Sequence, residues 1–416
     1  MASEIKSSSL AVVLIGLLLV GCGGGDSKLS AAPDTGASGW QRDAANPLIA
    51  PTLTSTTLNY GPADPSLLYD TDDSKWKLWF SATDEDRTSG VKTISIKYSE
   101  SSDGVSWSAP QTALQVATGS GAWDYTNVET PAVIKNPDPT APAEEKFMLY
   151  YAGANTDLAV SEKRPTSFPY YQIGLAYSAD GKSFTRYSPG LNSKPGLVLE
   201  ADVGLFGSSL PGTFGDGLVA DPSVVYKDGV YHLWFSSYAE TVPTPLAPAG
   251  RTALAFGISH VTSSDGVHWS ASHGNPLGTL AKPGESTGGQ QPSVLFNAGT
   301  NQFEMWFSND SDTEKQAIPC SFNTVTGFWH AVSDDGISWT PDYSARDLSY
   351  DNSLAYESYG FLTGVAAVLV NSTYYLYYSA WGTEQIPDSS LYLCPDQTGV
   401  LFPAVLTLNR ASMTSR

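Results

Sequence analysis

The stretch that decides the fold reads Asp221-Pro222-Ser223-Val224-Val225-Tyr226, and after a short break it continues as Tyr231-His232-Leu233-Trp234-Phe235-Ser236. Both runs are rich in β-branched and aromatic residues and are bounded by Gly, Asp or Pro, a pattern typical of short β-strands. Further along comes Ser264-Asp265-Gly266-Val267-His268-Trp269. Its Asp-Gly step predicts a tight turn, because glycine accepts a positive φ and aspartate hydrogen-bonds within its own turn.

This unit recurs along the chain. Four copies are clear and a fifth lacks the Asp-Gly step; their first strands open at Asp64, Thr130, Asp221, Gln291 and Val365. Repeats built from several short strands predict a propeller, because one such sheet cannot bury its own core and must pack with others around an axis. We therefore expect an all-β fold, a five-bladed β-propeller of four-stranded antiparallel blades. The strand-like segment from Leu393 to Leu408 is expected to pair with the chain near Trp40 and close the ring.

The N-terminus carries a different signal. Leu10–Val20 is an unbroken apolar run of 11 residues that follows Lys6. A membrane-spanning helix needs about 20 such residues, so the run has the length of a signal-peptide core instead. Its ending, Leu19-Val20-Gly21-Cys22, resembles the bacterial lipobox and implies a lipid on Cys22.

These features divide the chain into three parts. We expect a lipoprotein signal peptide over residues 1–21, a flexible Gly-rich tether over 22–38 and the propeller over 39–416. The lipobox resemblance implies a lipid-anchored protein of the bacterial cell envelope, at the outer membrane or cell surface, facing the periplasm or the exterior. Contact with the membrane is expected only through Cys22.

Composition limits the partners. The net charge is −20 at pH 7, and such a surface repels nucleic acid and anionic lipid headgroups. It suits an exported protein with neutral or cationic partners. The sequence has no Cys/His spacing typical of zinc and no phosphate-binding loop, so no metal and no cofactor are expected. Cys320 and Cys394 would be free to pair in an oxidising compartment, which the sequence leaves open.

The order of elements resembles the five-bladed propellers of glycoside hydrolase families 43, 32, 68 and 130. The matching features are Asn46–Ile49 ahead of the first unit, Asp64-Pro65, Trp123-Asp124 ahead of Pro131, and Ile173–Ser178 followed by Asp180-Gly181. The resemblance covers nearly the whole chain after residue 38. It implies that carboxylates at the propeller axis cleave glycosidic bonds without a cofactor.

Glycoside hydrolysis uses two carboxyl groups, one ionised and one protonated. By the resemblance, Asp64 matches the base or nucleophile of the first blade. Glu129 and Asp221 stand at the second and third axial positions, where one would be the acid and the other an orienting group. Which is which stays open, because family 43 usually has a Glu in the third blade and this chain has Asp221-Pro222 there; Glu240 is an alternative.

Three further residues precede the axial strands and are candidates for binding a substrate. Trp123 is expected to stack on a sugar ring, and Asp124 to bond its hydroxyl groups. Asp216 occupies a similar position ahead of the third unit. The competing interpretation is that these residues only shape their loops.

The leading hypothesis is therefore an envelope glycoside hydrolase acting on a neutral oligo- or polysaccharide. It predicts that Asp64, Glu129 and Asp221 converge at the axis. One alternative is a non-catalytic propeller that binds glycan or protein, and a second is a purely structural envelope lipoprotein.

Overall fold

The structure is a computed structural model. It describes residues 39–53, 57–86, 91–155, 171–200, 218–242, 253–271, 277–280, 289–308, 327–351, 353–358, 361–382, 393–395, 401–403 and 405–414. Cys22, the expected signal peptide and tether, and Cys320 lie outside these residues. The described part contains no helix that is long and apolar enough to cross a membrane.

Regular structure in the described ranges is almost entirely β-strand. The strands are β1 (Gln41–Arg42), β2 (Thr52–Leu53), β3 (Thr57–Asp70), β4 (Lys75–Asp86), β5 (Val91–Ser101), β6 (Gln111–Leu114), β7 (Asn127–Lys135), β8 (Phe147–Ala154), β9 (Gln172–Ser178), β10 (Thr185–Arg186), β11 (Leu197–Leu199), β12 (Leu218–Lys227), β13 (Val230–Val242), β14 (Ala253–Ser263), β15 (Gln290–Asn297), β16 (Gln302–Ser308), β17 (Gly327–Ser333), β18 (Thr340–Asp342), β19 (Leu348–Ser349), β20 (Phe361–Val370), β21 (Thr373–Gly382), β22 (Leu393–Pro395), β23 (Leu401–Pro403) and β24 (Val405–Thr414). Four 3-10 turns, Ala143–Glu145, Leu191–Ser193, Gly278–Leu280 and Ala355–Glu357, complete them.

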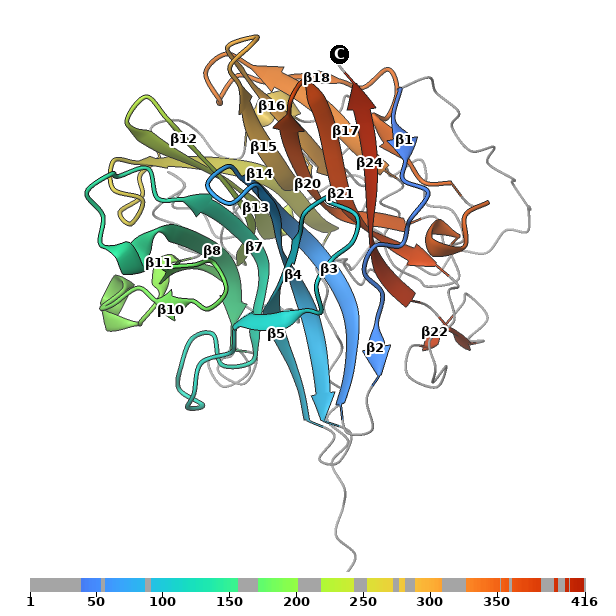
Figure 1. Cartoon of the computed structure of the whole chain (residues 1–416). Helices are drawn as coiled ribbons and strands as arrows, with labels where there is room; N and C mark the ends of the chain where they lie inside the picture. The colour runs from blue at the N-terminus through green and yellow to red at the C-terminus, as the bar shows by residue number, and fades with distance from the viewer. Residues whose placement is uncertain are drawn as a thin grey trace, which may run out of the picture.

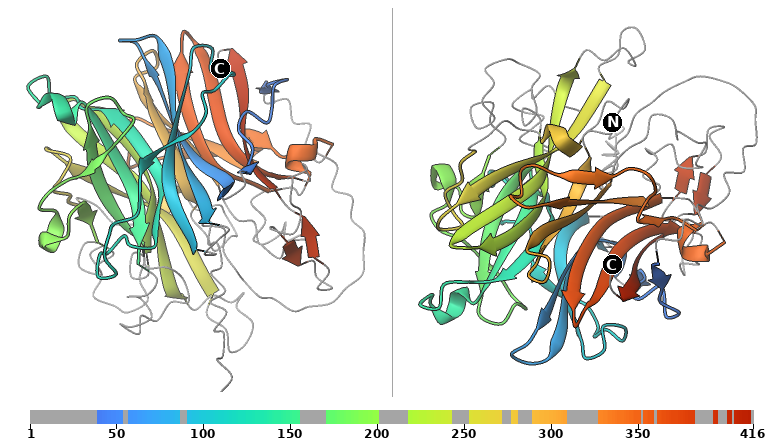
Figure 2. Two further views of the ribbon diagram at one scale, coloured as in Figure 1. Left: turned by 60° about the horizontal axis from the view of Figure 1, so that its bottom comes forward. Right: turned by 90° about the horizontal axis from the view of Figure 1, so that it is seen from above.

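The strands form antiparallel meanders, one for each sequence unit: β3-β4-β5, β7-β8-β9, β12-β13-β14, β15-β16-β17 and β20-β21-β24. Short strands extend most of them at the outer edge, whereas the third sheet has three described strands. The first strands contact one another in a closed cycle, from β3 through β7, β12, β15 and β20 back to β3. Figures 1 and 2 show the resulting arrangement of sheets around a common centre. The predicted all-β, antiparallel class is therefore confirmed.

The Asp-Gly turns join each sheet to the one before it. The carbonyl of each turn glycine accepts a hydrogen bond of 2.5–2.8 Å from a buried aromatic side chain of the preceding unit. The donor and acceptor pairs are Trp79 and Gly181, Tyr150 and Gly266, Trp234 and Gly336, and Tyr377 and Gly104. Trp306 of the fourth unit has no such turn to bind, and its indole N–H donates to Asp347 at 2.6 Å. The repeated dipeptide is thus a contact between units as well as a turn.

Glycine is required in these turns for two reasons. Gly181 has a φ of +78°, and a Cβ on it would lie 3.0 Å from the Trp79 ring. A larger residue would be strained and would also push the Trp79 ring away from its hydrogen bond. The large aromatic residues of the strands therefore serve as packing: Trp79, Trp234 and Trp306 are fully buried.

The two ends of the described chain meet in one sheet. β1 pairs with β24, and Arg42 forms an ion pair with the fully buried Glu357 at 2.8 Å. The sequence predicted that a C-terminal strand would pair with the chain near Trp40, which the structure confirms. The pairing strand is Val405–Thr414, in place of the expected Leu393 to Leu408 segment.

Candidate axial carboxylate site

Each first strand is interrupted at the same point by a shift in register. The residue at that point has a positive φ of 48–53° in every unit: Asp64, Thr130, Asp221, Gln291 and Gly364. Such a backbone is strained for residues other than glycine. Because this backbone conformation occurs in all five units, it belongs to the architecture, whereas the side chain at that point differs from unit to unit.

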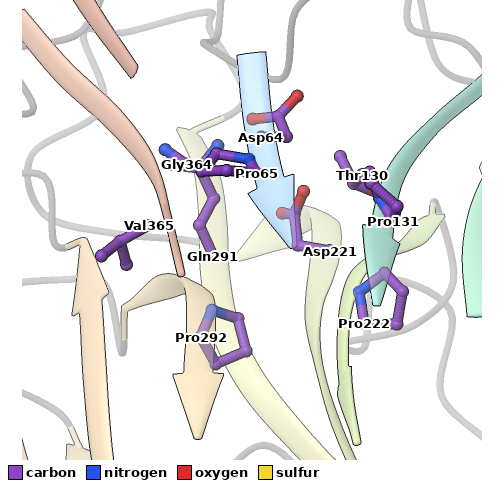
Figure 3. Close-up of a pocket in the computed structure, with 10 residues that line it drawn as sticks. All are labelled: Asp64, Pro65, Thr130, Pro131, Asp221, Pro222, Gln291, Pro292, Gly364 and Val365. Carbon is purple, nitrogen blue, oxygen red and sulfur yellow. Dashed lines mark hydrogen bonds between the residues drawn. The ribbon is translucent and has the colours of Figure 1, made fainter. Parts of the chain in front are cut away.

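These five residues line one small pocket on the axis (Figure 3). The residues that follow them, Pro65, Pro131, Pro222, Pro292 and Val365, line it as well. This second set of five residues also lines a separate channel of about 440 Å³ that is bordered by the first strands. The axial pocket itself is about 30 Å³, which is room for about one water molecule. The four prolines and Val365 line both spaces, so they lie between the channel and the five positive-φ residues, which we call the ring positions.

Asp64 is 7 % exposed, and its Oδ2 has no hydrogen-bond partner among the described residues. Its backbone N–H donates to Ser379 Oγ at 3.0 Å, which fixes the strained backbone. Burial, with repulsion from Asp221 and Glu129, raises the pKa of Asp64 well above its usual value. A Cβ on Gly364 would lie 2.5 Å from Asp64 Oδ1, so the fifth unit leaves space for this carboxylate.

Glu129 is fully buried beside the ring, in the residue before Thr130. Its Oε1 accepts hydrogen bonds from Asn127 Nδ2 at 3.1 Å and from the Tyr171 hydroxyl, while Oε2 has no partner in the described part of the chain. Burial raises the pKa of Glu129 to about 7, although the bonds from Tyr171 and Asn127 oppose the rise. Oε1 is thus held in place by two hydrogen-bond donors.

Asp221 is 6 % exposed, and neither of its carboxylate oxygens accepts a hydrogen bond of normal geometry from a described residue. Burial raises its pKa to about 7, offset in part by the nearby Ser236 hydroxyl. In Figure 3 the Asp221 carboxylate points toward Asp64, and the charge of Asp221 contributes to the raised pKa values of both Asp64 and Glu129. Asp64 and Asp221 line the axial pocket together, whereas Glu129 is not among its lining residues.

Other buried oxygens that have no hydrogen-bond partner among the described residues include Thr130 Oγ1, Gln172 Oε1 and Gln290 Oε1. Sequence reasoning did not single out Gln172 or Gln290, nor the bonds that Asn127 and Tyr171 make to Glu129. Gln290 had a detectable signal, because Gln290-Gln291-Pro292 aligns with Glu129-Thr130-Pro131. Unpaired buried acceptors are costly, so they favour a ligand that supplies hydrogen-bond donors.

The predicted substrate-binding residues lie elsewhere. Trp123 stacks on Tyr151 with ring centroids 5.7 Å apart and belongs to a buried core, and it does not line the axial pocket. Asp124 is 1 % exposed and forms an ion pair with Arg186 at 2.7 Å. Both therefore have structural partners, which is what the competing interpretation expected. Asp216 lies outside the described residues, and Glu240 is in β13 with a side chain that the structure does not describe.

Metal ligands are not gathered in the described part of the chain. No group of three or more His, Cys, Asp or Glu side chains there has the geometry to hold a metal ion. His232 and His260 do meet, with 3.1 Å between Nδ1 and Nε2, but they form a stacked pair beside Trp234.

No protein-family model matches the chain, and no curated protein matches it. Solved structures do resemble it. A putative glycoside hydrolase from Parabacteroides distasonis aligns at a TM-score of 0.54 and 13% identity over 91% of this chain and 97% of its own. A family 117 glycoside hydrolase from Zobellia galactanivorans aligns at 0.54 and 12% identity over 90% of each chain.

A third similar structure has another activity. It is an N-acetylgalactosamine deacetylase from F. plautii in complex with blood group B trisaccharide, at a TM-score of 0.52 and 16% identity over 92% of this chain and 94% of that one. The resemblance to the fold of glycoside hydrolases is thus confirmed. At these identities it is the fold that is shared, and activity has to be argued from the site.

Proposed function

We propose that this protein is a glycoside hydrolase that cleaves glycosidic bonds in a neutral oligo- or polysaccharide, using Asp64, Glu129 and Asp221. The observation that carries the proposal is the cluster of three buried carboxyl groups with unpartnered oxygens and raised pKa values. Asp64 and Asp221 stand at positions where the architecture does not demand an acid, since the other units have Thr130, Gln291 and Gly364 there.

We further propose that the five sequence units are five blades of one propeller. The closed cycle of contacts between the first strands supports this count, as do the turns that link four of the units to their neighbours. An axial ring built from all blades brings residues from distant parts of the sequence to one point.

The chemistry follows from the protonation of the cluster. Hydrolysis needs one protonated and one ionised carboxyl group. With pKa values of about 7 for Glu129 and Asp221, and a pKa well above the usual value for Asp64, the cluster retains protons at neutral pH. For Asp64 to act as base or nucleophile, its proton has to pass to another group when substrate binds. Glu129 or Asp221 then donates a proton to the leaving oxygen as the glycosidic C–O bond breaks. The new bond to the anomeric carbon comes from Asp64 itself, or from a water molecule that gives its proton to Asp64.

Location is part of the proposal. The Leu10–Val20 run and the lipobox-like ending at Cys22 support export and lipid attachment at the bacterial cell envelope. The net charge of −20 is consistent with a neutral substrate, because it disfavours nucleic acid and anionic surfaces.

The test is release of reducing sugar from arabinans, xylans, fructans and mannosides by the purified protein and by Asp64→Asn and Asp221→Asn. We expect activity on at least one substrate and a loss of at least about a thousandfold in both variants. Asp228→Asn is the matched control, because Asp228 is exposed and also has a positive φ that Asn tolerates. Activity retained in both axial variants would contradict the assigned roles.

A second candidate is a non-catalytic propeller that binds glycan or protein. The small volume of the axial pocket, about 30 Å³, favours it, because a sugar ring needs more room. This reading expects glycan binding without release of reducing sugar on any substrate of the panel. Such a result would replace the hydrolase proposal.

A further inference from the structure

The junction between the fourth and fifth units differs from the other four. At the junction of the first and second units, the Asp-Gly turn of the second lies over the first. There Lys182 forms an ion pair with Glu100 at 2.8 Å and lies 5.6 Å from the centre of the Tyr98 ring. The fifth unit has no Asp-Gly step.

Where the turn is missing, the structure has an open cavity of about 700 Å³. His330 and Val332 line it, and they hold the strand positions of Tyr98 and Glu100 at the first junction. Tyr374 lines it as well, at the start of the middle strand of the fifth unit. The cavity therefore takes the place of the absent turn, and it shares no lining residue with the axial pocket.

The floor of the cavity is a buried polar group centred on Glu304, which is 4 % exposed. Its Oε1 accepts hydrogen bonds from Asn297 Nδ2 at 2.7 Å and from the Tyr374 hydroxyl at 2.8 Å, and Oε2 faces His330 Nε2 at 3.2 Å. Burial alone would raise the pKa of Glu304, but the hydrogen bonds from His330, Asn297 and Tyr374 lower it. The floor is therefore rigid and polar.

The walls of the cavity are partly apolar and partly polar. Val332, Pro341 and Leu369 present apolar groups, whereas Thr300, Thr340 and other polar residues line the rest. A sugar has an apolar face of C–H groups and a rim of hydroxyls, which match walls of these two kinds. Among the described residues the lining has no Lys or Arg, and it includes the acids Glu304 and Asp342, which disfavours an anionic ligand. The volume falls in the range of small-molecule sites, roughly 300–1,000 Å³.

We propose that this cavity is a second carbohydrate site, which binds a neutral glycan segment away from the axis. The choice of ligand class rests on the proposed function, while the cavity and its polar floor do not. A site of this kind would hold a polysaccharide chain on the protein without taking part in bond cleavage.

The test compares two tryptophan substitutions in protein whose axial carboxylates are replaced by Asp64→Asn and Asp221→Asn. Thr340→Trp places a large side chain in the cavity from an exposed strand position. Ser270→Trp is the matched control, because Ser270 is the exposed residue after Trp269, as Thr340 follows Trp339. At the junction next to Ser270, between the third and fourth units, the turn that contains Gly336 is present.

Binding is measured by affinity electrophoresis in gels that contain soluble arabinan, xylan, fructan or mannan. We expect at least one glycan to retard the control, with an affinity at least about tenfold weaker for Thr340→Trp. Thr300→Trp, from another part of the cavity, should act in the same way if Thr340→Trp does not fold. Equal retardation of cavity and control variants, or no retardation by any glycan, would overturn the second site.

These outcomes are separable from failure of the proposed function. Release of reducing sugar by the unsubstituted protein, with equal binding of the cavity and control variants, overturns only the second site. Cavity-dependent binding without any release of reducing sugar overturns only the hydrolase.

Discussion

At the scale of single residues, identical backbone geometry carries different side chains. The five ring positions share a φ of 48–53°, yet they hold two acids, a threonine, an amide and a glycine. Gly364 is informative, because it lacks the side chain that would collide with Asp64. The backbone thus forms a ring of five equivalent positions, and the side chains at these positions determine the chemistry of the axial pocket.

The buried carboxylate of Asp221 should cost the protein stability at high pH. Its pKa rises from 3.8 in the unfolded chain to about 7 in the folded one, so the folded state binds its proton more tightly. This contribution favours folding at low pH and is lost as the pH rises from about 4 to 7. At most it amounts to about 4 kcal/mol.

We therefore expect Asp221→Asn to raise the melting temperature at pH 8 by at least about 3 °C and to change it little at pH 4. Thermal unfolding at the two pH values checks this. Asp228→Asn, at an exposed position, should show no such dependence on pH. A variant that is less stable than the parent protein at pH 8 would contradict the raised pKa.

Sequence reasoning found Asp64 and Asp221 because a varying residue before a repeated proline is a local signal. It did not find Tyr171, which reaches Glu129 across 42 positions of the chain and follows no motif. It assigned Asp124 to a ligand because the partner Arg186, 62 positions away, is not visible in sequence. Contacts between distant residues were the part that could not be predicted.

At the scale of elements, the strands and Asp-Gly turns were predictable because alternation and turn chemistry are local properties. The register shift at each ring position was not, since it depends on the packing of neighbouring sheets. The contact between each turn and the preceding sheet was also hidden, although it explains why aromatic residues recur at one strand position.

The hydrogen bond from Trp79 to the Gly181 carbonyl provides a test at this scale. Trp79→Phe removes the buried donor and leaves the carbonyl unpaired. Trp107→Phe is the control, because the Trp107 indole N–H is buried without a hydrogen-bond partner among the described residues. We expect the first variant to lose about 1–3 kcal/mol more of the free energy of unfolding, measured with denaturant. Equal losses would mean that the turns do not link the units energetically.

At the scale of the whole molecule, closure depends on both ends of the described chain. β1 adds to β24, so the sheet of the fifth unit is completed by residues from the start of the propeller region. Arg42 and Glu357 lie on either side of this joint. The sequence indicated such a closure but not its register. The junction between the fourth and fifth units has no Asp-Gly turn from the fifth unit, and the cavity of about 700 Å³ lies there.

We propose that the axial carboxyl groups cleave glycosidic bonds, and the pH dependence of kcat/KM is the measurement that tests this proposal. It would be measured with the best substrate of the panel, for the parent protein and for Glu129→Gln, Asp64→Asn and Asp221→Asn. We expect a bell-shaped profile with its maximum close to neutral pH, because Glu129 and Asp221 have pKa values of about 7, and loss of activity in the variants. A flat profile from pH 5 to 9, unchanged by the three substitutions, would contradict it.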